Sequence, residues 1–148
     1  MLPFCGYNMG DYFDHWFNMG RKNTMPVPIF RVNWFLKKDG KFLWPGFGDN
    51  MRVLKWIIYR VHGRAKAVES PVGLMPTYED IDWTGLDITR EDFDIRMTVD
   101  KKAWKNELLQ EELFMRHSER LPCEMIMERQ QFLSRLNRSN DLWTPPHN

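Results

Sequence analysis

The sequence predicts an α+β protein with four to five helices around a small hairpin or mixed sheet. Four segments carry apolar residues at helical spacing, and residues that cap or end helices bound them. Residues 29–35 instead alternate between the two faces of a strand, and a strong turn signal follows before residue 44. A chain of 148 residues with 43% hydrophobic and 28% charged residues is large enough for one domain with a core.

The charge and the cysteine content exclude several function classes. A net charge of +1 without a basic run offers little to neutralise phosphates, so no nucleic-acid partner is expected. The sequence has no CxxC pair and no apolar run of 18 residues, so we expect a cytoplasmic protein without a membrane partner. Seven Trp, ten Phe and ten Met exceed what a small domain usually buries, which favours a partner surface or self-association.

Residues 1–28 are predicted to form a helix and a linker. The helix is expected to bury one aromatic face and to end at Gly20. His15 lies within this helix. We assign it no metal-binding or catalytic role, because no second metal ligand stands four residues further on. Pro26 and Pro28 mark the linker. The aromatic face comprises Tyr12, Phe13, Trp16 and Phe17.

Residues 29–50 are predicted to form a hairpin followed by a loop. The first strand, residues 29–35, is rich in branched and aromatic side chains, and it places Phe35 on the face that points away from the core. Asp39-Gly40 is the expected turn, and residues 42–44 form the expected return strand. The hairpin therefore presents rings on both of its faces.

Three phenylalanines in this region can converge on one flat apolar object. Phe35, Phe42 and Phe47 are separated by turn residues, and a nucleotide base is an object of the right kind. Asp49 is expected to cap the next helix, which leaves the Asn50 amide free to donate to and accept from a base edge. Two other interpretations remain open. The rings could grip a peptide or a single strand in a non-enzymatic binding module, or they could form the core of the hairpin.

Residues 51–138 are predicted to be mainly helical. One helix ends at Gly63, Asp100 caps the next, and Pro122 opens the last. Residues 139–148 are expected to be a frayed tail. The predicted inward positions are Val53, Leu54, Ile57, Ile58 and Val61 in the first of these helices, Trp104, Leu108 and Met115 in the second, and Met125, Phe132 and Leu136 in the third.

The stretches between these helices are predicted to be connections. Residues 64–76 contain two prolines and a glycine, and residues 79–94 are acidic. Asp80 and Asp82 match ligand positions of a calcium-binding loop. The position that normally takes an apolar residue holds Asp87, and no second loop exists, so we interpret the match as chance within a solvated linker.

The sequence holds no motif for phosphate binding or hydrolysis. It contains no GxxxxGK[ST] loop, no HExxH and no GxSxG. The one highly specific run is Trp44-Pro45-Gly46-Phe47-Gly48. With residues 1–13, 15–16, 32–35, 42–50 and 52–57, this run resembles the C-terminal part of the GTP-dependent phosphoenolpyruvate carboxykinase family. Residues 71–73, 85–86 and 121–124 continue the resemblance in the same order, so it covers nearly the whole chain.

The resemblance implies a piece of the nucleotide-binding domain of a gluconeogenic lyase. That enzyme decarboxylates oxaloacetate and phosphorylates the enolate from GTP, giving phosphoenolpyruvate, GDP and carbon dioxide, with Mn²⁺ or Mg²⁺. By the resemblance, Phe35, Phe42 and Phe47 enclose the guanine base, Asn50 forms a hydrogen bond with it, and Phe4 lies near the substrate. These implications fit the aromatic loop, because stacking holds a base and a polar group at its edge selects it.

The chain departs from the family pattern in two ways. The turn between Phe35 and Phe42 is one residue shorter than we expect. The family's phosphate loop, metal ligands, substrate arginines and lid would all lie before Met1, so we expect no catalytic residue and no metal ligand in this chain. We therefore expect the missing N-terminal part of the enzyme as a partner, and no activity from the chain alone.

Overall fold

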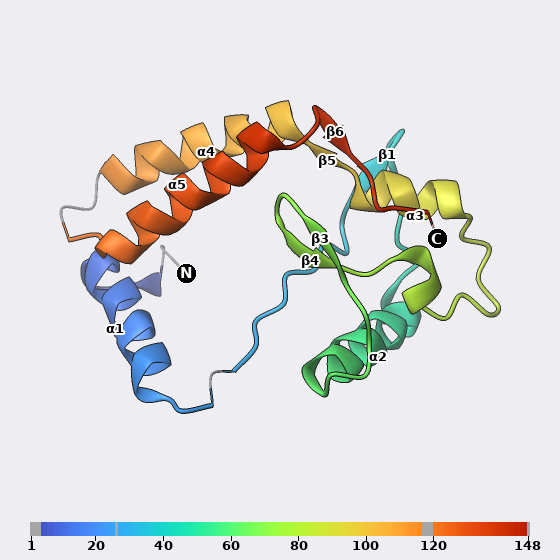
Figure 1. The fold of residues 1–148 in the computed structure, drawn as a ribbon, viewed down its shortest axis with the longest axis horizontal. Coiled ribbons are helices and arrows are strands. Elements are labelled where there is room, and N and C mark those ends of the chain that lie inside the picture. The colour runs from blue at the N-terminus through green and yellow to red at the C-terminus, as the bar shows by residue number, and fades with distance from the viewer. Residues whose placement is uncertain (1–3, 26, 117–119, 148) are drawn as a thin grey trace. The chain divides into compact units, whose positions relative to one another are not determined.

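A computed structural model describes residues 4–25, 27–116 and 120–147, with side chains left out at residues 111–116. The described residues form five α-helices and three two-stranded sheets, so the predicted α+β class is confirmed (Figure 1). The chain divides into two compact units that the sequence did not mark. The first comprises Met1–Val27 and Asp100–Asp141, and the second comprises Pro28–Val99 and Leu142–Asn148.

The first unit contains α1 (Met9–Lys22), α4 (Lys101–Arg116) and α5 (Cys123–Arg138). The Asn8 side chain caps α1 by accepting a hydrogen bond from the backbone N–H of Gly10 at 2.7 Å. The predicted end at Gly20 is wrong, because the helix continues for two more residues before the backbone becomes extended. The predicted aromatic face is only half-buried, and Trp16 is exposed.

Helices α4 and α5 pack through apolar side chains on facing sides. The rings of Trp104 and Phe132 meet edge to face with centroids 5.6 Å apart, and Leu108 and Leu136 are buried. Asp100 caps α4 as predicted, because its Oδ1 accepts a hydrogen bond from the third helical N–H at 2.9 Å. The predicted inward position of Met115 falls among the side chains that are not described.

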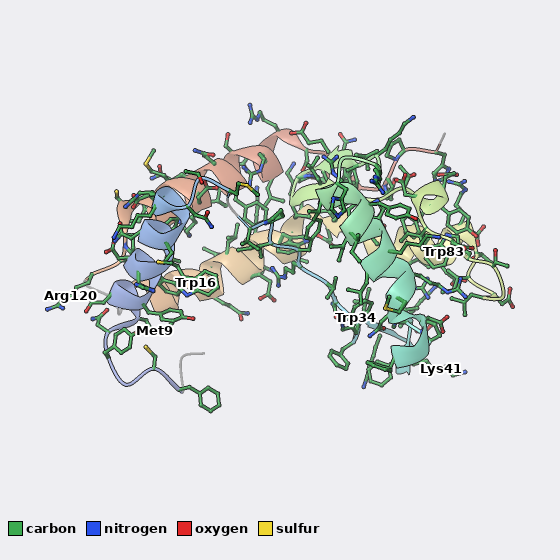
Figure 2. The ribbon with its side chains drawn as sticks, turned by 90° about the horizontal axis from the view of Figure 1, so that it is seen from below. Met9, Trp16, Trp34, Lys41, Trp83 and Arg120 are labelled. Carbon is green, nitrogen blue, oxygen red and sulfur yellow. The ribbon has the colours of Figure 1, made fainter. Side chains whose placement is uncertain are left out.

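Gly10 lies where α1 approaches the chain just before α5. Figure 2 shows Arg120 beside the N-terminal end of α1, where Met9 is labelled. A Cβ atom at Gly10 would lie 2.3 Å from the backbone oxygen of Arg120, far inside van der Waals contact. The neighbouring ion pair of Arg120 and Asp11, at 3.1 Å, holds the same two segments together. Only glycine fits this contact.

The second unit begins with the hairpin of β1 (Lys37–Lys38) and β2 (Lys41–Phe42). The predicted turn is confirmed, since Asp39 and Gly40 both have positive φ, at 52° and 77°, as a two-residue hairpin turn requires. The predicted strand over residues 29–35 is wrong. That stretch is irregular, because no segment in the described part of the chain pairs with it.

Helix α2 (Asn50–Val61) is confirmed, but it buries a different side from the one predicted. Trp56 is buried, and its ring meets that of Phe30 edge to face with centroids 6.1 Å apart. Its indole N–H donates to the backbone oxygen of Lys66 at 3.2 Å. Positions 54, 58 and 61 of the predicted apolar face are exposed instead. The helix ends with Gly63, as predicted, through a hydrogen bond from its N–H to the oxygen of Arg60 at 3.1 Å.

The core of the second unit lies in the stretch predicted to be a solvated acidic linker. Tyr78 and Trp83 stack with ring centroids 5.4 Å apart, and both meet the buried ring of Phe93 edge to face. Ile81 and Ile88 complete this core. The linker prediction is therefore wrong. The apolar residues between the acidic ones pack together and form a core.

Helix α3 (Arg90–Met97) was missed by the sequence analysis. It starts with a capping box, in which Thr89 Oγ1 accepts from the N–H of Asp92 at 3.1 Å and the Asp92 carboxylate accepts from Thr89. These hydrogen bonds to the Asp92 carboxylate hold its pKa below the usual range. The same Thr-x-x-Asp spacing is visible in the sequence and was the available signal.

Two further predictions about connections are corrected by the structure. Residues 64–76 contain a second hairpin, of β3 (Val68–Ser70) and β4 (Gly73–Met75), with Glu69 paired to Leu74. The tail is not frayed up to residue 147, because residues 142–147 contain β6 (Leu142–Trp143) and a buried proline. The remaining elements are β5 (Val99–Asp100) and the short 3₁₀ helices η2 (Phe47–Asp49) and η3 (Tyr78–Asp80).

No helix in the described part of the chain is long and apolar enough to cross a membrane.

We predict opposite effects for the same substitution at two glycines of α1. Gly10→Ala should lower the unfolding free energy by about 1–3 kcal/mol, because the new methyl group overlaps the Arg120 carbonyl. Gly20→Ala should raise it by up to about 1 kcal/mol, because nothing lies within 4 Å of its Cβ position and alanine favours the helix. Urea unfolding measures both. Equal effects would contradict the contact at Gly10.

Candidate functional site

The three phenylalanines predicted to bind a base are all exposed side chains of the second unit. Phe35, Phe42 and Phe47 are 75%, 56% and 91% exposed. The rings of Phe35 and Phe42 meet edge to face with centroids 6.3 Å apart, whereas Phe47 contacts no other ring of the described residues. We call these three side chains the ring site. The structure therefore brings two of the predicted residues into contact, and it gives the third no ring contact among the described residues.

Local backbone geometry positions each ring. Asn33 Oδ1 accepts a hydrogen bond from the N–H of Phe35 at 3.0 Å, which turns the chain and leaves the Phe35 ring outside. Phe42 lies on β2 opposite Lys37, whose Nζ stands 4.5 Å from the ring centroid in a cation–π contact. Phe47 begins η2 directly after Gly46.

Gly46 adopts a backbone conformation that only glycine populates readily. Its φ of 145° and ψ of −173° lie in a region closed to residues with a Cβ atom. The turn separates Trp44-Pro45 from Phe47, so it determines the direction in which Phe47 leaves the hairpin. A Cβ atom at Gly46 would meet nothing within 4 Å, so the requirement comes from the backbone alone.

Trp44 connects the end of the hairpin to the start of α2. Its ring packs on Trp34 with centroids 5.4 Å apart, and its indole Nε1–H donates to Asn50 Oδ1 at 2.7 Å. Asp49 occupies the N-cap position, but the predicted capping hydrogen bond is absent. The Asp49 carboxylate instead accepts from Nε of Arg52 at 3.0 Å. The Asn50 oxygen is thus occupied by the indole, so the amide is not free to accept from a base edge in the way that the sequence predicted.

Arg52 fixes the first turn of α2 to the core of the second unit. Its Nη1 donates to the backbone oxygen of Asp82 at 2.6 Å, and its Nη2 donates to that of Thr84 at 2.8 Å. Hydrogen bonds from the side chain and the backbone of Thr84 hold the pKa of the Asp82 carboxyl below its usual range. The acidic positions of the apparent calcium loop therefore serve this local structure.

Arg96 of α3 holds the segment just before Trp44. Its Nη2 donates to the backbone oxygen of Leu43, while Nε and Nη1 are buried without a partner in the described part of the chain. Burial lowers the pKa of this guanidinium from its ordinary value. Helix α3 and the hairpin are therefore connected close to the ring site.

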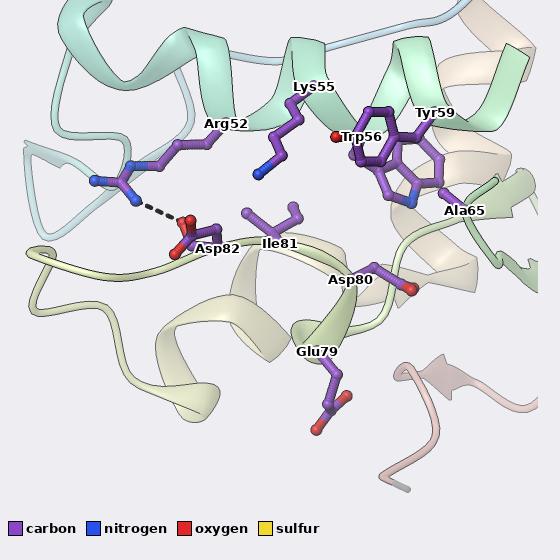
Figure 3. Close-up of a pocket in the computed structure, with 9 residues that line it drawn as sticks. All are labelled: Arg52, Lys55, Trp56, Tyr59, Ala65, Glu79, Asp80, Ile81 and Asp82. Atoms are coloured by element: carbon purple, nitrogen blue, oxygen red, sulfur yellow. Dashed lines mark hydrogen bonds between the residues drawn. The ribbon is translucent and has the colours of Figure 1, made fainter. Parts of the chain in front are cut away.

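A shallow pocket of ≈ 230 Å³ lies between α2 and the segment that contains η3 (Figure 3). Figure 3 shows Arg52 bonded to Asp82 on one side, with Lys55 and the ring of Trp56 along the helix. The carboxylate of Asp80 accepts from Thr77, so it is already in use as a cap. None of the predicted base-binding residues lines this pocket.

Phe4 belongs to the first unit and is 84% exposed. Its predicted position near a substrate stays a prediction. In residues 4–25, 27–116 and 120–147, no group of three or more His, Cys, Asp or Glu side chains could hold a metal ion.

Comparison with known families identifies the chain. Residues 1–135 match the model of the phosphoenolpyruvate carboxykinase C-terminal P-loop domain. The chain belongs to this family. The match includes every residue of the ring site and Asn50, whereas the sequence contains no GxxxxGK[ST] motif.

Curated relatives carry the name phosphoenolpyruvate carboxykinase [GTP]. The protein of Paenarthrobacter aurescens is 49% identical over 132 residues, which cover 86% of this chain and 22% of the relative. The protein of Neocallimastix frontalis is 51% identical over 111 residues, covering 73% and 18%. That of Thermoplasma volcanium is 42% identical over 129 residues, covering 86% and 22%. The chain thus spans about a fifth of the length of these relatives.

Gly46 and Gly48 provide a matched test of the turn that directs Phe47. Gly46→Ala should lower the unfolding free energy by about 1–3 kcal/mol, because alanine cannot adopt the backbone angles without strain. Gly48 has no positive φ and equally open surroundings, so Gly48→Ala should change stability by well under half of that amount. Urea unfolding decides, and equal losses at both glycines would contradict the strained turn.

Proposed function

We propose that the ring site and Asn50 hold the guanine base of GTP or GDP, within a GTP-dependent phosphoenolpyruvate carboxykinase. The observation that carries this proposal is the exposure of all three rings within one short stretch of the second unit, which ends at an amide that the Trp44 indole holds in place. Large apolar side chains are usually buried, and rings that stay exposed together are typical of a surface that awaits a ligand. Membership of the carboxykinase family supports the choice of guanine.

In the proposed site, stacking supplies affinity for the base and hydrogen bonding supplies selectivity. Each base–ring contact contributes about 1–3 kcal/mol and tolerates any base, because every base has a flat face. The amide of Asn50 adds preference, since a base with the wrong edge leaves a polar group unpaired. The exposures of the rings also argue against the alternative in which they form the hairpin core.

The reaction that we propose for the whole enzyme is the conversion of oxaloacetate and GTP to phosphoenolpyruvate, GDP and carbon dioxide. In this reaction the γ-phosphoryl group passes to the enolate that decarboxylation leaves behind. The described residues offer no group for a metal ion, and the sequence has no phosphate loop, so we assign base binding alone to this chain. Mn²⁺ or Mg²⁺ and the phosphate contacts are proposed for the remainder of the enzyme.

We further propose that the exposed apolar side of α2 contacts that remainder. Leu54, Ile58 and Val61 recur at helical spacing and are 39%, 49% and 49% exposed. Such a stripe is costly to leave in water and favours association. In the absence of the remainder, the same stripe favours self-association of the chain, which sedimentation velocity measures.

We predict that Phe47→Ala weakens GDP binding by about tenfold, because it removes a ring that is 91% exposed and free to stack. An NMR titration with millimolar GDP measures the weak affinity expected without phosphate contacts. Met25→Ala is the control, since it removes an apolar side chain that is 80% exposed from the other unit, at a position with no predicted site role, and it should leave GDP affinity unchanged. Equal losses in the two variants would overturn the assignment of the ring site.

The purified chain should form no phosphoenolpyruvate from oxaloacetate and GTP with Mn²⁺ present, because it has no phosphate loop. A coupled assay for phosphoenolpyruvate measures this. Turnover above the rate without protein would contradict the restriction of this chain to base binding.

A further inference from the structure

We propose that Trp44 is a positioning residue that orients the Asn50 amide so that its NH₂ group, and not its oxygen, faces the base. The site then selects a purine with an oxygen at position 6, such as guanine or hypoxanthine, over adenine, which carries an amino group there. This inference rests on the proposed base-binding function. It adds that Asn50 acts toward the base as a hydrogen-bond donor.

The indole determines which atom of the amide is which. A tryptophan Nε1–H can only donate, so the Asn50 atom that lies 2.7 Å from it must be the carbonyl oxygen. The usual ambiguity between the oxygen and the nitrogen of an asparagine side chain is thereby removed. Because the amide is planar, its NH₂ group lies on the side away from the Trp44 hydrogen bond.

The NH₂ group of Asn50 is free to act on a ligand. It donates no hydrogen bond to any described residue, and its nitrogen is not fully buried. Asn50 itself is half-exposed and is the first residue of α2, so its backbone is fixed by the helix. A fixed and accessible donor therefore lies three residues after Phe47.

The Trp44 ring and the backbone just before it are both held by neighbouring groups, so Trp44 can impose this orientation. Its ring packs on Trp34 with centroids 5.4 Å apart and an angle of 45° between the ring planes. The backbone oxygen of Leu43, one residue earlier, accepts a hydrogen bond from Arg96 of α3. The indole is thus a rigid donor. Because it is already ordered, ligand binding costs it little further conformational entropy.

The chemistry of the purine edge supplies the selectivity. Guanine and hypoxanthine present the acceptor O6, which pairs with the Asn50 NH₂ group. Adenine presents a 6-amino group, so two donors would face each other and both would stay unpaired. A freely rotating asparagine could turn its oxygen toward adenine, but that rotation would break the hydrogen bond with Trp44. Discrimination therefore depends on the indole N–H.

The test uses the ¹⁵N-labelled 148-residue chain and NMR titrations with GDP, IDP and ADP. The unmodified chain should bind GDP and IDP better than ADP. Trp44→Phe keeps a ring but removes the N–H, and it should reduce the ratio of GDP to ADP affinity by about three- to tenfold, the effect of one hydrogen bond. Trp34→Phe is the matched control, because it alters the same ring pair, keeps the Trp44 N–H, and should leave the ratio unchanged.

A second variant serves if Trp44→Phe does not fold. Asn50→Asp keeps an oxygen for the indole but has no donor at neutral pH, so it should lose the preference for GDP and gain affinity for ADP. Without any ligand, Asn50→Ala should shift the resonance of the Trp44 indole N–H, because its acceptor is gone.

The outcomes separate the inference from the proposed function. If GDP perturbs the ring site but Trp44→Phe keeps the full GDP preference, the role of Trp44 is overturned and the base site stands. An unchanged indole resonance in Asn50→Ala overturns the inference as well. If millimolar GDP perturbs no resonance of the ring site in the unmodified chain, the proposed function fails and the inference fails with it.

Discussion

The hydrogen bond from the Trp44 indole to Asn50 is the interaction on which the geometry of the candidate site depends. It closes the turn between the hairpin and α2 at 2.7 Å, and the strained Gly46 and the exposed Phe47 both lie inside that turn. Arg52 and Arg96 add further connections, from the first turn of α2 to the segment around Asp82 and from α3 to Leu43. The loop is therefore held at several points, although it has almost no regular secondary structure of its own.

This arrangement separates the rings that stabilise the fold from the rings that stay exposed. Tyr78, Trp83 and Phe93 form a core within the second unit, and Trp34 and Trp44 pack on each other. Fully burying one further phenylalanine would contribute about 1.5–3 kcal/mol, so three exposed rings leave a considerable free energy unused in the chain alone. A flat ligand that covers them recovers part of it, which is why exposure and binding are physically linked at this site.

The sequence predicted those features that depend on local signals. Asp39-Gly40 predicted the turn because both positions need positive φ, and helical spacing with nearby start and stop residues predicted the existence of α2, α4 and α5, although the buried side and the cap of α2 were wrong. The strand over residues 29–35 failed because a strand also needs a partner, which local alternation does not reveal. The sidedness of that stretch was right only in part. Phe35 is exposed as predicted, and Phe30 and Trp34 on the opposite face are half-buried, but Val32 on that face is exposed. The hydrogen bonds of Trp44, Arg52 and Arg96 join segments distant in sequence or depend on side-chain geometry, so the pattern of residues could not show them.

The most direct test of base binding at the ring site is the position of the nucleotide itself. Intermolecular nuclear Overhauser effects can be measured between GDP and the 148-residue chain with selectively labelled phenylalanine, tyrosine and tryptophan residues. Base binding at the ring site predicts contacts from the guanine H8 and ribose H1′ protons to the rings of Phe42 and Phe47, with Phe35 at the edge of the same contact. Contacts confined to other residues, such as Trp56 and Tyr59 in the pocket beside α2, would contradict it.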